Sequence, residues 1–413
     1  MRLQGFLGIV VFLAIAWTAS EKRRAVSFRA ILTGVVAQFA VAAILLHVPW
    51  LEERLRSLNG VVLLLDEATR QGTSFVFGYI GGAPPPFLLQ NPGANFILAF
   101  QALPLVLVIG ALSALLFHWH VLSWVVRGLS FLLRKSLRVG GALALGAAAT
   151  IFLGMVEAPL LVKPYLRRMT RSELFSLMTV GMACIAGTVM ILYATILKDV
   201  IPDALGHILV ASFIHVAAAI TVARVMIPES GEPTAGNLAP PRTASGSMDA
   251  IVRGTTDGLT LLLNIVAMLV VMVALVHLAN AVLALLPHAG GEAITLQRIL
   301  GIVMAPVVWL FGIPWPEART AGALMGTKTI LNELLALTDL ARLPTGALDA
   351  RSRLIMLYAL TSFANLGSLG VLIGGLGSLE PERRSEVVNL GMKAVVAGTL
   401  ATCMTGAVVG ILL

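Results

Sequence analysis

The sequence predicts an all-α polytopic membrane protein. Of its 413 residues, 58% are hydrophobic and only 12% are charged, and the mean hydropathy is +0.92. A typical soluble domain has about twice that charged fraction. Several apolar runs are long enough to cross about 30 Å of hydrocarbon as helices. These runs lack the alternation of apolar and polar residues that β-barrel strands show, which excludes a barrel.

The basic charge of the chain does not indicate nucleic-acid binding. The formal net charge is +8 and the pI is near 10.0. Arg and Lys collect in short loops, as they do on the cytoplasmic side of membrane proteins. The sequence contains no basic stripe with interleaved aromatic residues. Its two cysteines, Cys184 and Cys403, lie in separate apolar segments and form no disulfide framework.

Residues 1–139 predict membrane helices and interfacial helices. Three apolar runs are expected to span the membrane: 3–19, 30–47 and 95–117. Two other segments carry charges or aromatic anchors at helical spacing and are expected at the interface: 50–77 and 118–138. Arg and Lys between the first two runs predict a cytoplasmic loop, which places the N-terminus outside.

Residues 140–227 predict a helical hairpin that enters the membrane and returns. Small residues run to Ala149, and Gly154 and Pro159 then interrupt the apolar run. Glu157 lies at this break. A carboxylate at membrane depth costs about 3 kcal/mol, so it is expected to face a cavity or a partner. Two spans follow the hairpin: 172–197 and 204–225.

The second half of the chain repeats this order after a flexible linker. The linker, residues 228–247, is rich in Pro, Gly, Ser and Thr. The expected parts after it are a long span (259–286) and a short helix (295–311) in residues 248–313, a second broken hairpin and an interrupted span in residues 314–377, and a last span in residues 378–413. Glu333 is the second intramembrane acid. Two such acids, each beside a helix break in its own half, predict an inverted-repeat transporter with a solute site at the midplane.

Motifs along nearly the whole chain resemble the concentrative nucleoside transporter family. The most specific is glycine-any-lysine, three residues, then Asn-Glu, which reads Gly326-Thr327-Lys328-Thr329-Ile330-Leu331-Asn332-Glu333. The other matching blocks are Ser20–Arg29, Ser74–Gly82, Ala99–Pro104, Glu157–Leu166, Met169–Leu174, and Phe363–Asn365 with Ser368. The resemblance implies eight membrane helices and two re-entrant hairpins per subunit. It also implies a homotrimer in the lipid bilayer, here a bacterial inner membrane, and ion-driven uptake by an elevator motion.

The resemblance also implies the substrate contacts. Sugar hydroxyls would bind Glu157, Glu333, Asn365 and Ser368. In the family a glutamine and a serine or threonine of the first hairpin hold the nucleobase, but Met155 and Val156 stand here. A site that hydrogen-bonds a ligand group discriminates strongly and an apolar one does not, so base recognition is expected to differ. The predicted substrate-binding residues are Gly154, Met155, Val156, Glu157, Asn332, Glu333, Phe363, Asn365 and Ser368.

The implied ion site consists of Thr150, Leu153, Cys184 and Ile185. Sodium-coupled members use an asparagine and a serine where Thr150 and Cys184 stand. Sodium prefers hard oxygen ligands, for which a thiol is a poor substitute. Backbone carbonyls at the breaks and the Thr150 hydroxyl could still bind sodium, and proton coupling is the alternative. No organic cofactor is expected.

The preferred function is therefore a secondary active symporter for nucleosides or related ribose-bearing solutes. A symporter of another small hydroxylated solute is the alternative. An intramembrane enzyme with Glu157 and Glu333 as acid and base lacks supporting motifs, since no HExxH or GxSxG occurs. A passive channel or a non-transporting scaffold is a further alternative. Lys328 is expected to pair with a carboxylate or to cap a hairpin, and His215 is a candidate proton relay.

Overall fold

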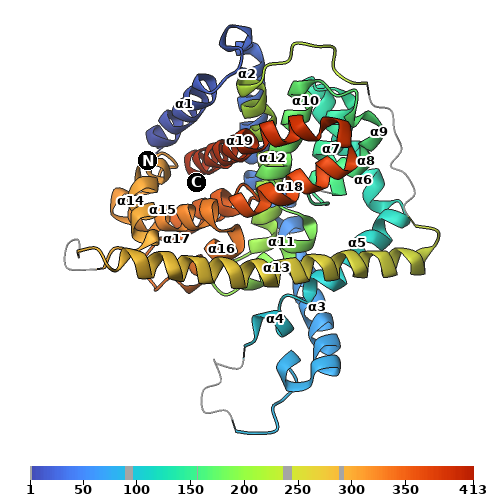
Figure 1. Ribbon diagram of the computed structural model, residues 1–413, viewed down its shortest axis with the longest axis vertical. Helices are drawn as coiled ribbons and strands as arrows, with labels where there is room; N and C mark the ends of the chain where they lie inside the picture. Colours follow the sequence, from blue (N-terminus) through green and yellow to red (C-terminus); the bar gives the residue numbers. More distant parts are fainter. Residues whose placement is uncertain (1, 89–95, 156, 236–243, 288–292) are drawn as a thin grey trace.

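The computed structural model describes residues 2–88, 96–155, 157–235, 244–287 and 293–413 (Figure 1). All regular structure within these ranges is helical. The helices α12 (Ala204–Met226) and α19 (Arg384–Leu412) pack against each other, and most of each is buried. The long helix α13 (Ser247–Leu283) crosses one side of the molecule, and few of its side chains are buried. The predicted all-α architecture is confirmed.

The N-terminal part follows the predicted order, with one difference. Its helices are α1 (Arg2–Thr18), α2 (Phe28–His47), α3 (Pro49–Phe77), α4 (Leu98–Gln101), α5 (Leu105–His118) and α6 (Val121–Leu137). The predicted span 95–117 was expected as one helix, but the structure divides it into α4 and α5. Pro104 lies at the division, where its ring disfavours helical backbone at the preceding residue and it has no N–H to donate.

The first hairpin is interrupted around Gly154, as predicted, but not at Pro159, which lies in the first turn of the helix Glu157–Leu161, where a proline ring is tolerated. Its helices are α7 (Gly141–Thr150), α8 (Glu157–Leu161) and α9 (Lys163–Leu166), followed by α10 (Arg171–Ala183) and α11 (Gly187–Leu197). α7 packs against α8 across the interruption. The predicted span 172–197 also contains a break, at residues 184–186, which separates α10 from α11. The re-entrant course of the hairpin through the membrane stays a prediction.

The second half contains two further breaks. Its helices after α13 are α14 (Leu296–Trp309), α15 (Trp315–Ile330), α16 (Glu333–Arg342), α17 (Ala350–Leu360) and α18 (Leu366–Leu379), and α19 ends the chain. Glycines let α14 and α15 pack closely, because a Cβ on Gly322 would lie 2.6 Å from the carbonyl oxygen of Gly301. α15 is separated from α16 at Leu331 and Asn332, and α17 from α18 at residues 361–365.

The helix lengths identify a multi-pass membrane protein. Among the described residues, six segments are long and apolar enough to cross a membrane: Phe28–His47, Leu98–His118, Arg171–Leu197, Ala204–Met226, Ser247–Leu283 and Pro381–Leu412. Shorter apolar helices include α1, α7, α14 and α18. The predicted total of eight spanning helices stays a prediction.

The start of α13 corrects the sequence-based boundary. A span was predicted over 259–286, but α13 begins at Ser247, inside the predicted linker 228–247. The predicted span began only at residue 259 because Asp249, Arg253 and Asp257 precede the apolar run. The structure shows why they are tolerated: Arg253 Nε donates to Asp249 Oδ1 at 2.9 Å, an i,i+4 pair along the helix surface. Residues 236–243 of the predicted linker lie outside the described residues.

A polar network joins the loop after α1 to α10 and α19. Glu21 accepts hydrogen bonds from Arg171 Nε at 3.1 Å, Arg171 Nη2 at 2.9 Å and Lys393 Nζ at 2.7 Å. The bond from Arg171, with the help of Lys393, lowers the pKa of Glu21 to about 2. Glu21 thereby links three segments that are distant in sequence: the loop after α1, the start of α10 and the first half of α19.

Replacing Glu21 with glutamine is expected to lower the free energy of unfolding by about 1 kcal/mol at pH 7, as a partly exposed ion pair contributes. Because the folded pKa is depressed, this contribution is present above the unfolded pKa near ~4.3 and is lost as the pH falls toward 2. Thermal unfolding of both proteins in detergent at pH 7 and at pH 3 measures it. Glu382→Gln is the control, since the Arg167–Glu382 pair is largely exposed. Equal midpoints for wild type and Glu21→Gln at pH 7 would contradict the prediction.

Candidate functional site

The buried carboxylate of Glu333 is the centre of the site. Tyr193 Oη on α11 donates to Glu333 Oε1 at 2.6 Å, and Asn365 Nδ2 before α18 donates to Oε2 at 2.8 Å. Glu333 is 6% exposed and Asn365 is 1% exposed. Each carboxylate oxygen therefore has one protein donor. An ionised carboxylate has about four lone-pair positions, so each oxygen can accept a further bond from a ligand.

The backbone at both second-half breaks is held by asparagine caps. Asn332 Oδ1 accepts from Leu335 N at 2.9 Å and caps α16. Asn365 Oδ1 accepts from Ser368 N at 2.8 Å and caps α18. Such caps satisfy backbone N–H groups that a helix start leaves without partners, which matters most in a water-poor interior. Glu333 in the first turn of α16 also lies at the positive end of the helix dipole.

Three helix breaks are joined by backbone hydrogen bonds. Phe363 N donates to the carbonyl oxygen of Cys184 at 3.3 Å, which links the α17–α18 break to the α10–α11 break. Gly187 N donates to the carbonyl oxygen of Phe152 at 3.1 Å, which links α11 to the tip of the first hairpin. The predicted residues Phe363 and Ser368 are both half-buried at this junction. Elements from both halves of the chain thus meet at the helix breaks, where their backbone groups bond to one another.

Glu157 lies on a cavity beside this junction. The cavity has a volume of about 620 Å³, within the usual range for small-molecule sites. Its lining residues on the hairpin side include Leu153, Gly154 and Glu157, with Thr188 from α11. Gly154 lets the Glu157 carboxylate approach the backbone closely, because an added Cβ would lie 2.3 Å from Glu157 Oε2 and the side chain would have to shift.

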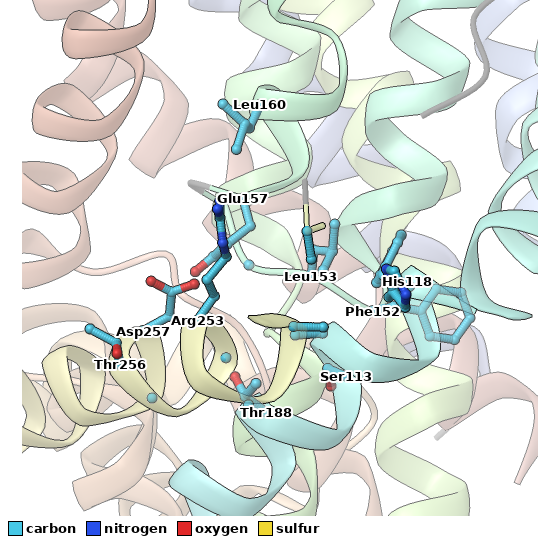
Figure 2. Close-up of a pocket in the computed structure, with 18 of the residues that line it drawn as sticks. Ser113, His118, Phe152, Leu153, Glu157, Leu160, Thr188, Arg253, Thr256 and Asp257 are labelled. Atoms are coloured by element: carbon cyan, nitrogen blue, oxygen red, sulfur yellow. The ribbon is translucent and has the colours of Figure 1, made fainter. Parts of the chain in front are cut away.

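The opposite wall of the cavity belongs to α5 and α13. It includes Ser113, Arg253 and Asp257. Figure 2 shows the Arg253 side chain extending from α13 toward Glu157, with Asp257 beside it. Glu333, Asn365 and Ser368 are not among its lining residues. The structure therefore brings Glu333 and Asn365 into direct contact and places Glu157 on the neighbouring cavity.

Of the two expected base-reading positions, 155 and 156, the structure describes the first. Met155 is 7% exposed, and it packs against Gly181 of α10, where an added Cβ would lie 3.0 Å from Met155 Cβ. Val156 lies outside the described residues. An apolar side chain packed in this way offers no hydrogen bond to a nucleobase.

The side chains of the predicted ion site bond to backbone. Thr150 Oγ1 donates to the carbonyl oxygen of Gly146 at 2.8 Å, and Cys184 Sγ donates to that of Ser212 at 3.7 Å. Ile185 is buried at the α10–α11 break, and Leu153 is half-buried on the cavity. The carbonyl oxygens near the breaks are the hard ligands that a sodium ion would find here.

Tyr193 is the contact that sequence analysis missed. It belongs to no motif and lies mid-helix in an apolar stretch. The signal that could have found it is its hydroxyl, because a buried tyrosine hydroxyl needs a hydrogen-bond partner. Which partner it finds depends on how α11 and α16 pack.

Comparisons with known proteins agree with this geometry. The family model described as "Na+ dependent nucleoside transporter C-terminus" matches residues 207–410, its N-terminal counterpart matches residues 7–80, and a model described as "Nucleoside recognition" matches residues 99–200.

Individual relatives match over nearly their whole length. The chain is 35% identical to an uncharacterized transporter, YutK, of Bacillus subtilis, covering 99% of this chain and 98% of that protein. It is 33% identical to the nucleoside permease NupC of Helicobacter pylori, covering 98% and 96%. The solved structure of CNTnw in an inward-facing substrate-bound state superimposes with a TM-score of 0.91 at 33% identity, covering 100% and 98%. The chain belongs to the concentrative nucleoside transporter family.

Proposed function

We propose that this protein is a secondary active symporter that imports nucleosides or closely related ribose-bearing solutes. The observation that carries the proposal is Glu333, a buried carboxylate with one donor on each oxygen and acceptor capacity left over. Ribose presents neighbouring hydroxyl donors that fit such an acceptor. Ser368, one turn into α18 from Asn365, adds a hydroxyl that can both donate and accept, and Glu157 contributes a second carboxylate from the adjacent cavity.

The proposed mechanism is an elevator motion with a coupling ion. The parts formed by residues 140–227 and 314–377 would carry the solute past the remaining helices. The protein would be a homotrimer in a bacterial inner membrane, with both termini of each subunit outside. Charge governs the motion, because a carboxylate without a counter-charge is costly to move past an apolar surface. The coupling ion is sodium, bound around Thr150, Leu153, Cys184 and Ile185, or a proton. The descriptions of the matching family models favour sodium.

A second candidate is a symporter of a different small hydroxylated solute. The packed Met155 side chain favours it, because this position lacks a hydrogen-bonding group for a base. Loss of such a group relaxes selection among rings while leaving the hydroxyl contacts unchanged.

Uptake into proteoliposomes tests the proposal. Radiolabelled uridine and adenosine are supplied under an imposed sodium gradient, an imposed proton gradient, or neither. Accumulation above the external concentration with one of the gradients is expected, and the effective gradient names the ion. Uptake of neither nucleoside by folded protein would contradict nucleoside transport, and competition by other hydroxylated solutes would then identify the substrate.

A further inference from the structure

Lys328 is a buried lysine at the end of α15. Its side chain is 0% exposed, and Nζ has no hydrogen-bond partner within the described ranges. Sequence analysis predicted that Lys328 pairs with a carboxylate or caps a hairpin. The charge of Lys328 does act on Glu333, although no hydrogen bond joins the two side chains. His215 of α12 and Cys403 of α19 are other titratable side chains in its electrostatic range. A buried ammonium is costly unless a negative charge balances it, so Lys328 depends on the Glu333 carboxylate.

The break between α15 and α16 favours a charge on both side chains. Lys328 lies in the last turn of α15, at the negative end of the helix dipole, which favours a cation. Glu333 lies in the first turn of α16, at the positive end, which favours an anion. Only Leu331 and Asn332 separate the two helix ends. The break therefore stabilises an ammonium and a carboxylate whose charges sum to zero.

The side chains that bond to Glu333 are neutral. Tyr193 of α11 and Asn365 before α18 each donate one hydrogen bond to it. Tyr193 is the one titratable residue of α11, and α18 carries no charged residue. The other acidic and basic residues of α15 and α16 lie in the first two turns of α15 or in the second half of α16: Glu317, Arg319, Asp339 and Arg342.

The polar residues of α17, which packs against α16, make other contacts. Arg351 and Arg353 donate to backbone carbonyl oxygens at 2.9 Å and 3.2 Å. The Tyr358 hydroxyl lies 3.0 Å from a histidine of α12. In the part of the chain that the structure describes, Lys328 thus supplies a positive charge that balances Glu333.

We propose that Lys328 is a positioning residue that keeps the Glu333 carboxylate ionised, so that this carboxylate accepts hydrogen bonds from the hydroxyls of the solute. The inference rests on the proposed function, because it explains how the acceptor of that site stays charged in an apolar interior. An ionised carboxylate only accepts, whereas a protonated one donates through one of its oxygens. Without the ammonium, burial favours the protonated form, and the site loses an acceptor.

Nucleoside binding by Lys328→Met at several pH values tests the proposal. Calorimetric titration with uridine in detergent measures the affinity at pH 6, 7 and 8. Because Glu333 takes up a proton more readily without its cation, we expect the affinity of Lys328→Met to be about tenfold below wild type at pH 6 and to recover at least about threefold by pH 8. Lys328→Arg keeps a permanent charge and should bind within about threefold of wild type at each pH. A loss of affinity in Lys328→Met that is equal at every pH would overturn the inference.

Lys198→Met is the matched control for the removal of a lysine. Lys198 follows α11, its side chain is 44% exposed, and it pairs with Asp66 at 3.5 Å. It should bind uridine like the wild type at each pH. The same pH dependence in Lys198→Met and Lys328→Met would also overturn the inference, because it would not require the buried pair.

A double variant guards against misfolding and needs no solute. Glu333→Gln leaves a buried ammonium without its anion, whereas Lys328→Met/Glu333→Gln removes both charges. We expect the double variant to unfold at a higher temperature than Glu333→Gln alone. Infrared spectra should show an ionised Glu333 in the wild type and a protonated one in Lys328→Met at pH 6, each identified by subtracting the matching Glu333→Gln variant.

These readouts separate the failure of this inference from that of the proposed function. Additive losses of stability in the double variant, or a protonated Glu333 in the wild type, would overturn the role of Lys328 and leave the proposed symport intact. Absence of nucleoside binding by folded wild-type protein would instead overturn the proposed function, and this inference with it.

Discussion

Replacing Glu333 with glutamine is expected to lower nucleoside uptake by about 100-fold or more while the protein still folds. Glutamine keeps the shape of the side chain but turns one acceptor oxygen into an NH₂ donor. That donor would then face either the Tyr193 hydroxyl or the Asn365 amide, which both donate to Glu333. The NH₂ group can accept neither that protein hydrogen bond nor one from the solute. Hydrogen bonds to charged groups contribute about 1.5–3 kcal/mol each, so losing these two corresponds to a loss of about 100-fold or more.

Initial rates of uridine uptake, normalised to the amount of reconstituted protein, measure this effect. Asp339→Asn is the matched control, because Asp339 lies on the same helix, α16, with an exposed side chain. It should transport like the wild type. If Glu333→Gln transported within tenfold of the wild type, the carboxylate would not be the principal group that binds the solute.

Replacing Gly187 with alanine is expected to reduce uptake at least tenfold, through geometry rather than lost chemistry. A Cβ on Gly187 would lie 2.5 Å from the carbonyl oxygen of Phe152 and 3.3 Å from its carbonyl carbon. Both atoms are backbone, so no side-chain rotation relieves the contact, and the tip of the first hairpin must move away from α11. That movement displaces Glu157 relative to Glu333. A destabilisation of about 1–3 kcal/mol is expected as well, as for other overpacked positions.

Uptake and thermal unfolding of Gly187→Ala in detergent measure the two effects separately. Gly374→Ala on α18 is the control, because an added Cβ there meets nothing within 4 Å. Full uptake by Gly187→Ala would show that the contact between the hairpin tip and α11 can open without disturbing the site. Loss of uptake in both variants would point to a general sensitivity of these helices to substitution.

Local backbone chemistry made the helix breaks predictable. Gly154 interrupts an apolar run in which a straight helix would otherwise continue, and the structure ends α7 before it and starts α8 at Glu157. Pro159, the other predicted break, lies inside α8. The polar pair Asn332-Glu333 and the patch around Asn365 likewise mark the starts of α16 and α18. Each of these helix-break signals consists of a few neighbouring residues, so it can be recognised without knowledge of the fold.

Two helix boundaries were predicted wrongly, one at a group of charged residues and one at a proline within an apolar run. The charged first turns of α13 were assigned to a linker and a short gap, although an i,i+4 ion pair lets the helix begin at Ser247. Pro104 divides the span expected over 95–117 into α4 and α5. In both segments the helix boundary depends on one local feature, an ion pair or a proline, and the average hydropathy of the segment does not report it.

The sequence by itself determined that this is a helical membrane protein of the nucleoside transporter type, with an acid beside a helix break in each half. Those properties follow from hydropathy, spacing and motifs, which are local. Only the tertiary structure decided that Tyr193 and Asn365 bond to Glu333 and that Glu157 faces a cavity shared with α13. It also buries Lys328 with no hydrogen-bond partner among the residues that the structure describes. These contacts join residues between 32 and 140 positions apart or depend on how whole helices pack, and no local pattern specifies which of several buried polar groups will meet.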